Sequence, residues 1–597
     1  MTHRSLRLSR RKGWYMVDPI TVEVVRHALI AAAEEMKTNL RRTAYNPIIY
    51  EVLDFSCGVL DRNTRMVAQS DGLPIFLGNL TATVSTMVAD VGVDRLRPGD
   101  VYLMNDPYEA GNHLNDVATI APVFSDGDEL LGFACTRAHW LDIGGKDPAG
   151  SLDATEIMQE GLWFRSVLLQ RAGEPVPAVY RMIEHNIRYA RNMLGDLRAQ
   201  VAATHVGAQR VREIFARHGT SVVEQAIASM HQQGDQRTRD AIRLMPDGVY
   251  EAETCMDDDC RGNGPLPVKV TATVEGSDLT IDLAGSHGQN VGPVNAGLPA
   301  TEAACKIALK ALTHPRTPTT DGDFEALRVL CPEDSMFNAQ FPAPTFMYTT
   351  HLITLTDLVI RALSGATPRM AVAGHYGHLC GFFFVGFEPT DGELYIHQEP
   401  EHGGWGAGPH GDGESAMISI ANGDTQNLPA EIIEARFPLR VERHALRPDT
   451  GGPGMYRGGL GTYRDYRVLG HNPEMTSVID RRTCPPWGLQ GGGSGSPARV
   501  MVDAEGAAPA EYGNGRRVRV GADQVVSVQT PGGGGWGSPL ARDPEQVRLD
   551  VERGYVTSAA ARLHYGVVVD EVGEFLDADA TARVREDLSR DEGVTTP

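Results

Sequence analysis

The chain has 597 residues, of which 42% are hydrophobic and 22% are charged. These fractions lie in the globular range and exclude a mostly disordered polymer, and the length predicts about four structural units. Acidic residues outnumber basic residues by 77 to 55, which gives a formal charge of −22. Because a field of that sign opposes contact with phosphate groups, we expect neither nucleic acid nor an anionic membrane surface as a partner.

Neither a membrane span nor a secretion signal is predicted. No window of about 18 consecutive residues is apolar throughout, and the basic start leads directly into an amphipathic segment. The eight cysteines include no CxxC pair, which in a chain of this length predicts reduced, buried thiols and no disulfide framework. We therefore expect a cytoplasmic protein.

The first part of the chain is predicted to combine one long helix with two hairpins. A helix start at Asp18 is followed by apolar residues that recur every three or four positions to about Arg42. Two pairs of apolar stretches, within 50–70 and within 117–138, flank turn-forming residues and are typical of β-hairpins. Residues before Met16 are expected to form a poorly ordered extension.

Helices and hairpins are intermixed further along the chain. Residues 176–218 have helical spacing and are expected to form two or more helices with a break near Gly207. Valine residues that alternate with lysine and threonine predict another hairpin over 268–283. Further apolar patterns predict helices near 299–313 and 347–364 and a hairpin over 382–396.

Glycine becomes frequent from Gly403 onward, in the segments GGWGAG, GGPGMYRGGLG, GLQGGGSGS and PGGGGWG. Such a density permits close approaches between strands and favours tight turns. Nucleotide binding is not predicted, because no segment fits GxxxxGK[ST] or a GxGxxG placed between a strand and a helix. Two short helices, over 543–553 and 558–564, and a charged, frayed tail after Thr581 are expected at the end.

These elements predict an α+β protein, a large multi-domain body of mixed helices and antiparallel β-hairpins with a glycine-rich β C-terminal part. Its expected divisions follow changes in composition and periodicity. They are a basic N-terminal extension at 1–17, a metal-site region at 18–175, a helical region at 176–260, a mixed hairpin region at 261–402, a glycine-rich region at 403–580 and a tail at 581–597.

The candidate metal site lies in the segment NDPYEAGNHLNDVATIAPVF, which begins at Asn105. His113 and Asp116 come just before an expected strand, and a hairpin that turns about Asp126 would bring His139 beside position 114. Two imidazoles and a carboxylate suit a borderline divalent ion such as Zn, Mn or Fe, with positions left open for water. The spacing HxxD alone is also common in hydrogen-bonded loops, so both interpretations stay open at this point.

Two further groups of polar residues have less specific patterns. Arg137 and Asp142 flank His139 and are predicted either to orient its ring or to form a solvated ion pair. The HxxH pair in GHYGH lacks the glutamate of HExxH, which favours packing or hydrogen bonding over metal binding. No role is therefore assigned to the cluster of His375, His378, His397, Glu399, Glu401, His402 and His410.

Several separated motifs together resemble the hydantoinase B/oxoprolinase family. They are EVLDFSCGVLD, MNDPYEAGNHLNDVATIAPVF, RAHWLDIGG, NLPAEIIEARFPLRVERHALRPDTGGPGMYRGGLG and TPGGGGWGSP. The likeness extends from about Asp18 to Gly566. Its members include N-methylhydantoinase, 5-oxoprolinase, caprolactamase, and acetone and acetophenone carboxylases.

The resemblance implies one subunit of an ATP-dependent hetero-oligomer. In such systems an A-type partner subunit with an actin-like ATPase fold binds ATP, which agrees with the absence of a P-loop here. The resemblance also implies that the B-type subunit holds a divalent metal, with ligands matching His113, Asp116 and His139 and an upstream aspartate matching Asp54. The assignment of Asp54 as a catalytic and metal-binding residue rests on the resemblance alone.

One departure from the family pattern concerns the substrate pocket. Relatives commonly carry a histidine in a PxHxG-like stretch, where this chain has LPIFLGNL with Phe76 at that place. A more apolar lining favours a substrate that carries an aromatic or alkyl group over a small, strongly polar lactam.

Three functions follow as hypotheses. The leading one is a cyclic-amide hydrolase of the hydantoinase and 5-oxoprolinase type, in which the metal activates water for ring opening of a substrate phosphorylated by the partner. The second is a subunit of an ATP-dependent ketone carboxylase, in which the same ion steadies an enolate-type oxygen. The third is a non-catalytic scaffold for the ATPase partner, with the imidazoles serving packing.

Overall fold

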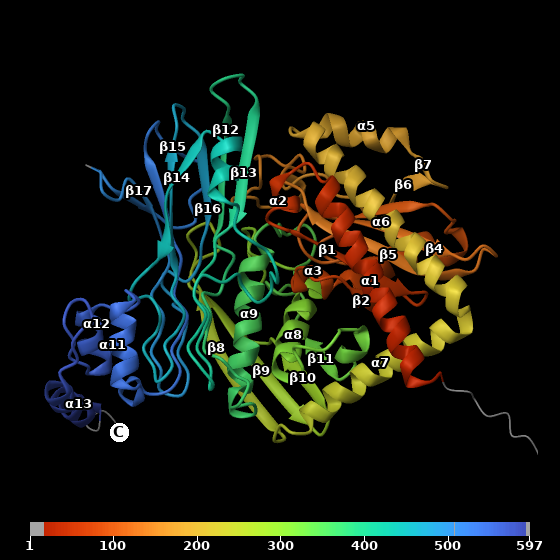
Figure 1. Cartoon of the computed structure of the whole chain (residues 1–597). Coiled ribbons are helices and arrows are strands. Elements are labelled where there is room, and N and C mark those ends of the chain that lie inside the picture. Colours follow the sequence, from red (N-terminus) through yellow and green to blue (C-terminus); the bar gives the residue numbers. More distant parts are fainter. Residues whose placement is uncertain (1–16, 507, 593–597) are drawn as a thin grey trace, which may run out of the picture.

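The computed structural model describes residues 17–506 and 508–592. In that part of the chain four β-sheets are flanked by helices, and a group of helices lies at the C-terminal end (Figure 1). The predicted α+β class, with intermixed helices and antiparallel hairpins, is confirmed. The expected N-terminal extension lies almost entirely outside the described residues. None of the described helices combines the length and the apolar character that a membrane crossing requires.

The first sheet has seven strands in the order β2-β1-β5-β4-β3-β6-β7. Its members are β1 (Phe55–Asp61), β2 (Met66–Gln69), β3 (Val101–Met104), β4 (Asp116–Phe124), β5 (Leu130–His139), β6 (Val167–Arg171) and β7 (Glu174–Pro175). Both hairpins predicted in this part are present, as β1–β2 and β4–β5. Helices α1 (Pro19–Thr43) and α6 (Ala190–His218) cover one face of the sheet (Figure 1). Helix α4 (Leu80–Val91) packs on the other face.

Helix α6 shows where a local pattern led to the wrong prediction. The expected break near Gly207 is absent, and the helix runs through this residue. Gly207 instead lies against α1, where a Cβ atom would be only 2.2 Å from the sulfur of Met36. The glycine therefore allows the two helices to approach closely, and the hydrogen bonds of the helix outweigh its cost of about 1 kcal/mol relative to alanine.

The second sheet has the order β11-β10-β9-β8 and is antiparallel apart from the β10–β11 pair. Its strands are β8 (Gly248–Met256), β9 (Leu266–Glu275), β10 (Asp278–Asp282) and β11 (Leu327–Leu330). Two helices, α8 (Leu298–Thr313) and α9 (Tyr348–Ala362), lie beside it (Figure 1). The hairpin and both helices agree with the sequence prediction.

Two further sheets lie face to face. One, in the order β13-β12-β16-β19, contains β12 (Gly381–Phe387), β13 (Leu394–Pro400), β16 (Glu474–Val478) and β19 (Val518–Arg519). The other, in the order β14-β15-β20-β17-β18, contains β14 (Leu439–Leu446), β15 (Thr462–Val468), β17 (Arg499–Val502), β18 (Ala510–Tyr512) and β20 (Val525–Gln529). The rings of Phe382 and Tyr466 stack between them, with centroids 5.6 Å apart.

Further helices and turns connect these layers. They are α2 (Pro47–Tyr50), α3 (Pro74–Leu77), α5 (Pro177–Asn186), α7 (Thr220–Ile242), α10 (Ala430–Arg436) and the 3-10 turns η1 (Val93–Arg95), η2 (Ile157–Gln159), η3 (Asp321–Phe324), η4 (Leu363–Gly365) and η5 (Pro539–Ala541).

The glycine-rich segments lie side by side and form hydrogen bonds between their backbones. The sequence predicted mainly tight turns here. Gly533 N–H donates to the carbonyl of Gly459, and Gly452 N–H donates to the carbonyl of Gly533. A Cβ atom on Gly533 would lie 2.0 Å from the carbonyl oxygen of Trp405. Glycine is needed here because backbones meet without intervening side chains, as the predicted close approaches between strands require.

The C-terminal helices are α11 (Pro544–Glu552), α12 (Ser558–Tyr565) and α13 (Ala578–Glu592). Val547, Val551 and Tyr565 belong to a small core that is separate from the main one. The sequence predicted a frayed tail after Thr581, but α13 continues through these residues to Glu592. The helix packs against the small core, where Arg585 donates to the carbonyl of Tyr565.

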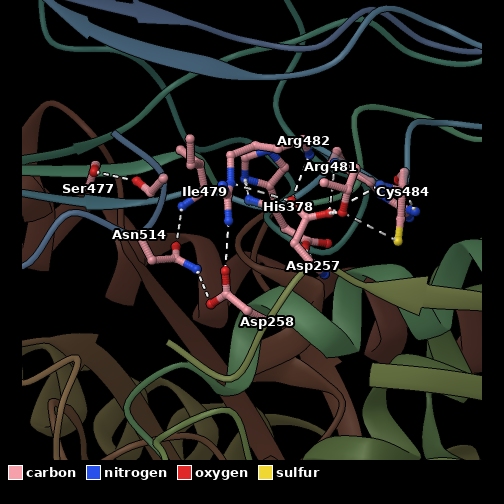
Figure 2. Close-up of polar contacts among 12 residues, drawn as sticks. Asp257, Asp258, His378, Ser477, Ile479, Arg481, Arg482, Cys484 and Asn514 are labelled. Atoms are coloured by element: carbon pink, nitrogen blue, oxygen red, sulfur yellow. Dashed lines mark hydrogen bonds and ion pairs between the residues drawn. The ribbon is translucent and has the colours of Figure 1, made fainter. Parts of the chain in front are cut away.

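One disulfide corrects the expectation that all the cysteines are free thiols. Cys255, on β8, is bonded to Cys484, in the loop that follows β16. The carboxylate of Asp257 accepts from the backbone N–H groups of Arg482, Thr483 and Cys484, so the same loop is held by a second attachment (Figure 2). The two bonded cysteines lie 229 positions apart, and no local pattern points to their pairing.

Candidate metal centre

The β4–β5 hairpin brings the predicted residues together, with a register two positions from the one expected. The sequence placed His139 beside position 114, but the structure pairs it with Asp116. A register shift between Val123 and Phe124 near the turn accounts for part of the difference. Asp116 therefore opens one strand and His139 closes the other, and a direct cross-strand pair holds both side chains at the same end of the sheet.

Three atoms from these strands and the preceding loop form a compact triangle. Nε2 of His113 lies 3.0 Å from Oδ1 of Asp116 and 3.2 Å from Nδ1 of His139. Nδ1 of His139 lies 3.1 Å from the same Asp116 oxygen. All three residues are buried, and they form the one group of metal-ligand type found among the described residues.

Each member of the triangle is held from outside by another residue. Nδ1–H of His113 donates to the carbonyl of Phe346 at 2.9 Å, and the hydroxyl of Tyr348 donates to Oδ2 of Asp116 at 2.8 Å. Nε2 of His139 lies 3.0 Å from the side-chain amide of Gln398. Outer partners of this kind fix the ring orientation and tautomer of metal-binding histidines.

The amide of Gln398 can face His139 in two orientations. Its nitrogen lies toward His139, while its oxygen is buried without a partner among the described residues. Rotation by half a turn would let the oxygen accept from Nε2–H of His139, and Nδ1 of His139 would then present its lone pair to the triangle.

With the rotated amide, lone pairs converge on one point. With hydrogens at Nδ1 of His113 and at Nε2 of His139, the two remaining ring nitrogens and the Asp116 oxygen are all acceptors. Three acceptors at these distances repel one another unless a proton or a cation lies among them. A donor set of two imidazole nitrogens and one carboxylate oxygen fits a divalent ion such as Zn, Mn or Fe.

Electrostatics favour charge separation within the triangle. Burial by itself would raise the pKa of Asp116, but the charges and hydrogen bonds of His113 and His139 hold it below its ordinary value. Burial would likewise lower the pKa of His139, but the hydrogen bond to Asp116 and the charges of Asp54 and Asp116 raise it. The site is thus built to keep an anion and a positive centre together.

Asp54 borders the same cavity but is outside the triangle. Its backbone carbonyl accepts from the N–H of His139, which ties the start of β1 to the end of β5. Burial raises the pKa of its carboxyl group to about 7, with His139 acting in the opposite direction and Asp116 adding to the rise. The structure therefore places Asp54 beside the three converging residues without bringing its carboxylate into their group.

The cavity at the triangle is small and mostly apolar. Its volume is about 40 Å³, which is room for an ion and one or two water molecules. Phe76, Phe346 and Phe383 line it together with Leu73, Met347, Leu379 and Val478. The position at which the sequence departs from the family pattern, Phe76, is thus part of this wall, as expected for an apolar lining.

The two residues flanking His139 do not touch the triangle. Arg137 is fully buried and donates to the side chains of Asn79 and Thr83, at the start of α4. Asp142 accepts from the backbone N–H of Arg188 and is paired with its guanidinium. Both hold neighbouring segments in place, and neither orients the His139 ring directly.

The second histidine-rich cluster does not converge. His375 is paired with Asp357, and Nδ1 of His378 accepts from the N–H of Cys380 near the Arg481–Cys484 loop (Figure 2). His397 stacks on aromatic rings. Within the described chain none of these side chains joins two others as a metal-type group.

Sequence reasoning missed the residues that hold the site from a distance. Tyr348 begins α9, Gln398 lies on β13, and Glu160 accepts from the N–H groups of Thr345 and Phe346. Burial raises the pKa of Glu160 to about 8. No motif marks these residues, because each reaches the triangle through packing between segments distant in the sequence.

Comparisons with known proteins identify the family of the chain. The model of the hydantoinase B/oxoprolinase family matches residues 18–539. A protein of Pseudomonas sp. (strain NS671), named as a candidate B-type component of a D-/L-hydantoinase, is 32% identical over 590 residues, which cover 95% of this chain and 98% of that protein.

Two solved structures share the fold. The crystal structure of an ATP-dependent caprolactamase from Pseudomonas jessenii is similar with a TM-score of 0.89 at 29% identity, covering 96% of this chain and 100% of the other. A nucleotide-free acetone carboxylase is similar with a TM-score of 0.88 at 19% identity, covering 97% of this chain and 84% of the other. At that lower identity the likeness concerns the fold alone.

Proposed function

The chain belongs to the hydantoinase B/oxoprolinase family, and on that premise we propose that it is the metal-carrying B-type subunit of an ATP-dependent cyclic-amide hydrolase. The observation that carries the proposal is the triangle of Nε2 of His113, Oδ1 of Asp116 and Nδ1 of His139. The three ligand atoms lie within 3.2 Å of one another in a buried site, as one ion with metal–ligand distances of about 2.0–2.2 Å permits.

The residues of the triangle would hold a divalent ion, Zn, Mn or Fe, with Asp54 as a further contributor because it lines the same cavity. When bound, such an ion polarises a carbonyl oxygen and makes a water molecule a stronger acid. Phe346, Tyr348 and Gln398 keep the three ligand side chains in the orientation that this requires. The apolar walls, Phe76 among them, exclude bulk water from the three ligand side chains.

ATP enters this scheme through a second polypeptide. Amides react slowly with water at neutral pH, and phosphorylation of the amide oxygen supplies a better leaving group. The chain has no P-loop, and one relative is named as the B-type component of a hydantoinase while another is named as an ATP-dependent caprolactamase. We therefore assign ATP binding to an A-type partner in a hetero-oligomer, located in the cytoplasm where ATP is available.

Metal analysis and activity together test the proposal. The complex with its A-type partner is expected to contain one divalent ion per chain and to hydrolyse a hydantoin or a lactam when ATP is added. His113→Ala and His139→Ala should lose the ion and reduce the rate by more than about 100-fold, since loss of an outer partner alone costs 10- to 100-fold. Full activity of both variants would refute the proposal.

The same preparation separates hydrolase from carboxylase. A ketone with labelled bicarbonate and ATP is the competing substrate pair, and label in an acid product would assign the chain to a ketone carboxylase instead. In that outcome the triangle would still bind the metal, so the metal analysis and the substrate assay answer different questions.

A further inference from the structure

A second, larger cavity lies beside the candidate metal centre. Its volume is about 420 Å³, against about 40 Å³ at the triangle. Small-molecule sites in proteins commonly have volumes of about 300–1,000 Å³ and mostly apolar walls. The apolar part of this wall includes Met66, Leu77, Ile307, Phe324, Trp405 and Ile420.

The two cavities share a thin wall. Pro74 and Leu77 of α3 line the large cavity, while Leu73 and Phe76 line the triangle cavity from the same turn. The second layer of the wall is the segment 420–422, in which Ile420 faces the large cavity and Asn422 the small one. The N–H of Ile75 donates to the carbonyl of Ala421 at 3.0 Å and joins the two layers.

One cation in the large cavity lacks a carboxylate partner within the described chain. Nζ of Lys306 donates to the carbonyl of Gly78 at 2.9 Å and lies 5.7 Å from the centre of the Phe324 ring. An ammonium group has three N–H donors, so Lys306 keeps donors for a ligand. Lys310, which also lines the cavity, is by contrast paired with Asp323.

The acidic residue of this wall is already engaged. Oδ2 of Asp321 accepts from the N–H of Met66 and from the hydroxyl of Thr81. It forms no ion pair with Lys306 among the described residues. The cavity therefore presents an apolar interior with a donor-rich cation at one side, together with the amide of Gln69, which both donates and accepts.

We propose that this cavity binds a small molecule that has an apolar ring or chain and a single carbonyl or carboxylate oxygen, with that oxygen accepting a hydrogen bond from Lys306. The site is separate from the triangle and goes beyond the proposed function. Two sources share this chemistry, a cyclic amide and a carboxylic acid with an apolar chain. The link to the cyclic amide, unlike the binding itself, rests on the proposed function.

Ligand-observed NMR titration of the assembled complex tests the site with two probes. ε-Caprolactam represents the cyclic amide and hexanoate the acid. Saturable binding of at least one probe is expected, and the tighter probe identifies the source. Lys306→Met keeps the apolar stem but removes the donor, so it should weaken binding about 10-fold or more, as for other charge-assisted hydrogen bonds.

A second variant fills the space. Ala311 on α8 lines the cavity, and Ala311→Phe should abolish binding of both probes. If that variant fails to fold, Lys306→Met alone decides the question. Absence of saturable binding by either probe, or binding that is unchanged in Lys306→Met, would overturn the proposal.

The metal-free variant separates this proposal from the proposed function. His139→Ala should lose the metal and the activity while it keeps binding in the large cavity, because no residue of the triangle lines that cavity. If binding persists but the wild-type complex has no metal-dependent hydrolase activity, the cavity site stands and the proposed function fails. Loss of probe binding in this variant would show that the probes bind at the triangle.

Discussion

Two regions of the molecule contain buried histidines and acidic residues, and they use them in opposite ways. In the β4–β5 region, the ring nitrogens of His113 and His139 face one carboxylate oxygen from two sides. In the region 375–402, the imidazoles are dispersed among separate partners. Residue type and burial are therefore similar in the two regions. They differ in whether the imidazole nitrogens face one common oxygen or separate partners.

Strand β13 links the two regions. Gln398 faces His139, whereas its neighbours His397 and Glu399 point to the other face of the sheet, toward Tyr466. One strand thus supports the triangle with one face and a buried polar cluster with the other. Variants on the two faces of this strand can therefore test whether the triangle is functionally distinct.

Among variants outside the triangle, the largest effect is expected from Tyr348→Phe, with Tyr466→Phe as its matched control. Tyr348→Phe removes the hydrogen bond to Oδ2 of Asp116 and should weaken metal binding 10- to 100-fold, measured by competition with a chelator. Tyr466→Phe removes a hydroxyl that bonds to Glu399 and Glu401 and should leave metal binding unchanged. Equal metal affinities in both variants would show that Tyr348 does not position Asp116.

A smaller effect is expected at Gln398. Gln398→Leu should weaken metal binding about 10-fold, because Nε2–H of His139 loses its acceptor. Gln398→Glu should retain the affinity, since a carboxylate accepts in the same place. The same chelator competition measures both variants, and a loss of affinity in Gln398→Glu that matches Gln398→Leu would contradict the rotated orientation of the amide.

The smallest effect concerns the pH dependence of stability. The pKa of Glu160 is raised from 4.5 to about 8, so the folded state binds more protons than the unfolded state between these values, and stability falls as pH rises through this window. The slope of the unfolding free energy against pH reports the difference in bound protons between the two states. Glu160→Gln should reduce that difference by up to about one proton, measured by chemical denaturation from about pH 4.5 to 8. An unchanged slope would exclude Glu160 as its source.

Glu401 provides the control in the other region. Burial raises its pKa as well, so Glu401→Gln should also flatten the fall in stability with rising pH. The two variants should differ in metal affinity, however. Glu160 holds the N–H groups of Thr345 and Phe346, and the carbonyl of Phe346 in turn fixes His113, so only Glu160→Gln should change it.

Prediction from sequence succeeded where the determining pattern is local. The hairpins at 50–70 and 117–138 were correct because turn residues and alternating strands lie within about 20 positions of each other. The break expected at Gly207 was wrong, because the glycine serves contact with α1. The disulfide between Cys255 and Cys484 was missed for a similar reason, since its partners meet only through packing of distant sheets.

The sequence by itself determined that His113, Asp116 and His139 share one end of a hairpin, since a short turn and a period of two fix which residues of adjacent strands are neighbours. Only the tertiary structure decided which contacts hold the three side chains in their orientations. The contacts from Phe346, Tyr348 and Gln398 span 233, 232 and 259 positions of the chain. Such contacts depend on how whole sheets and helices pack around the core. No short sequence motif predicts that packing.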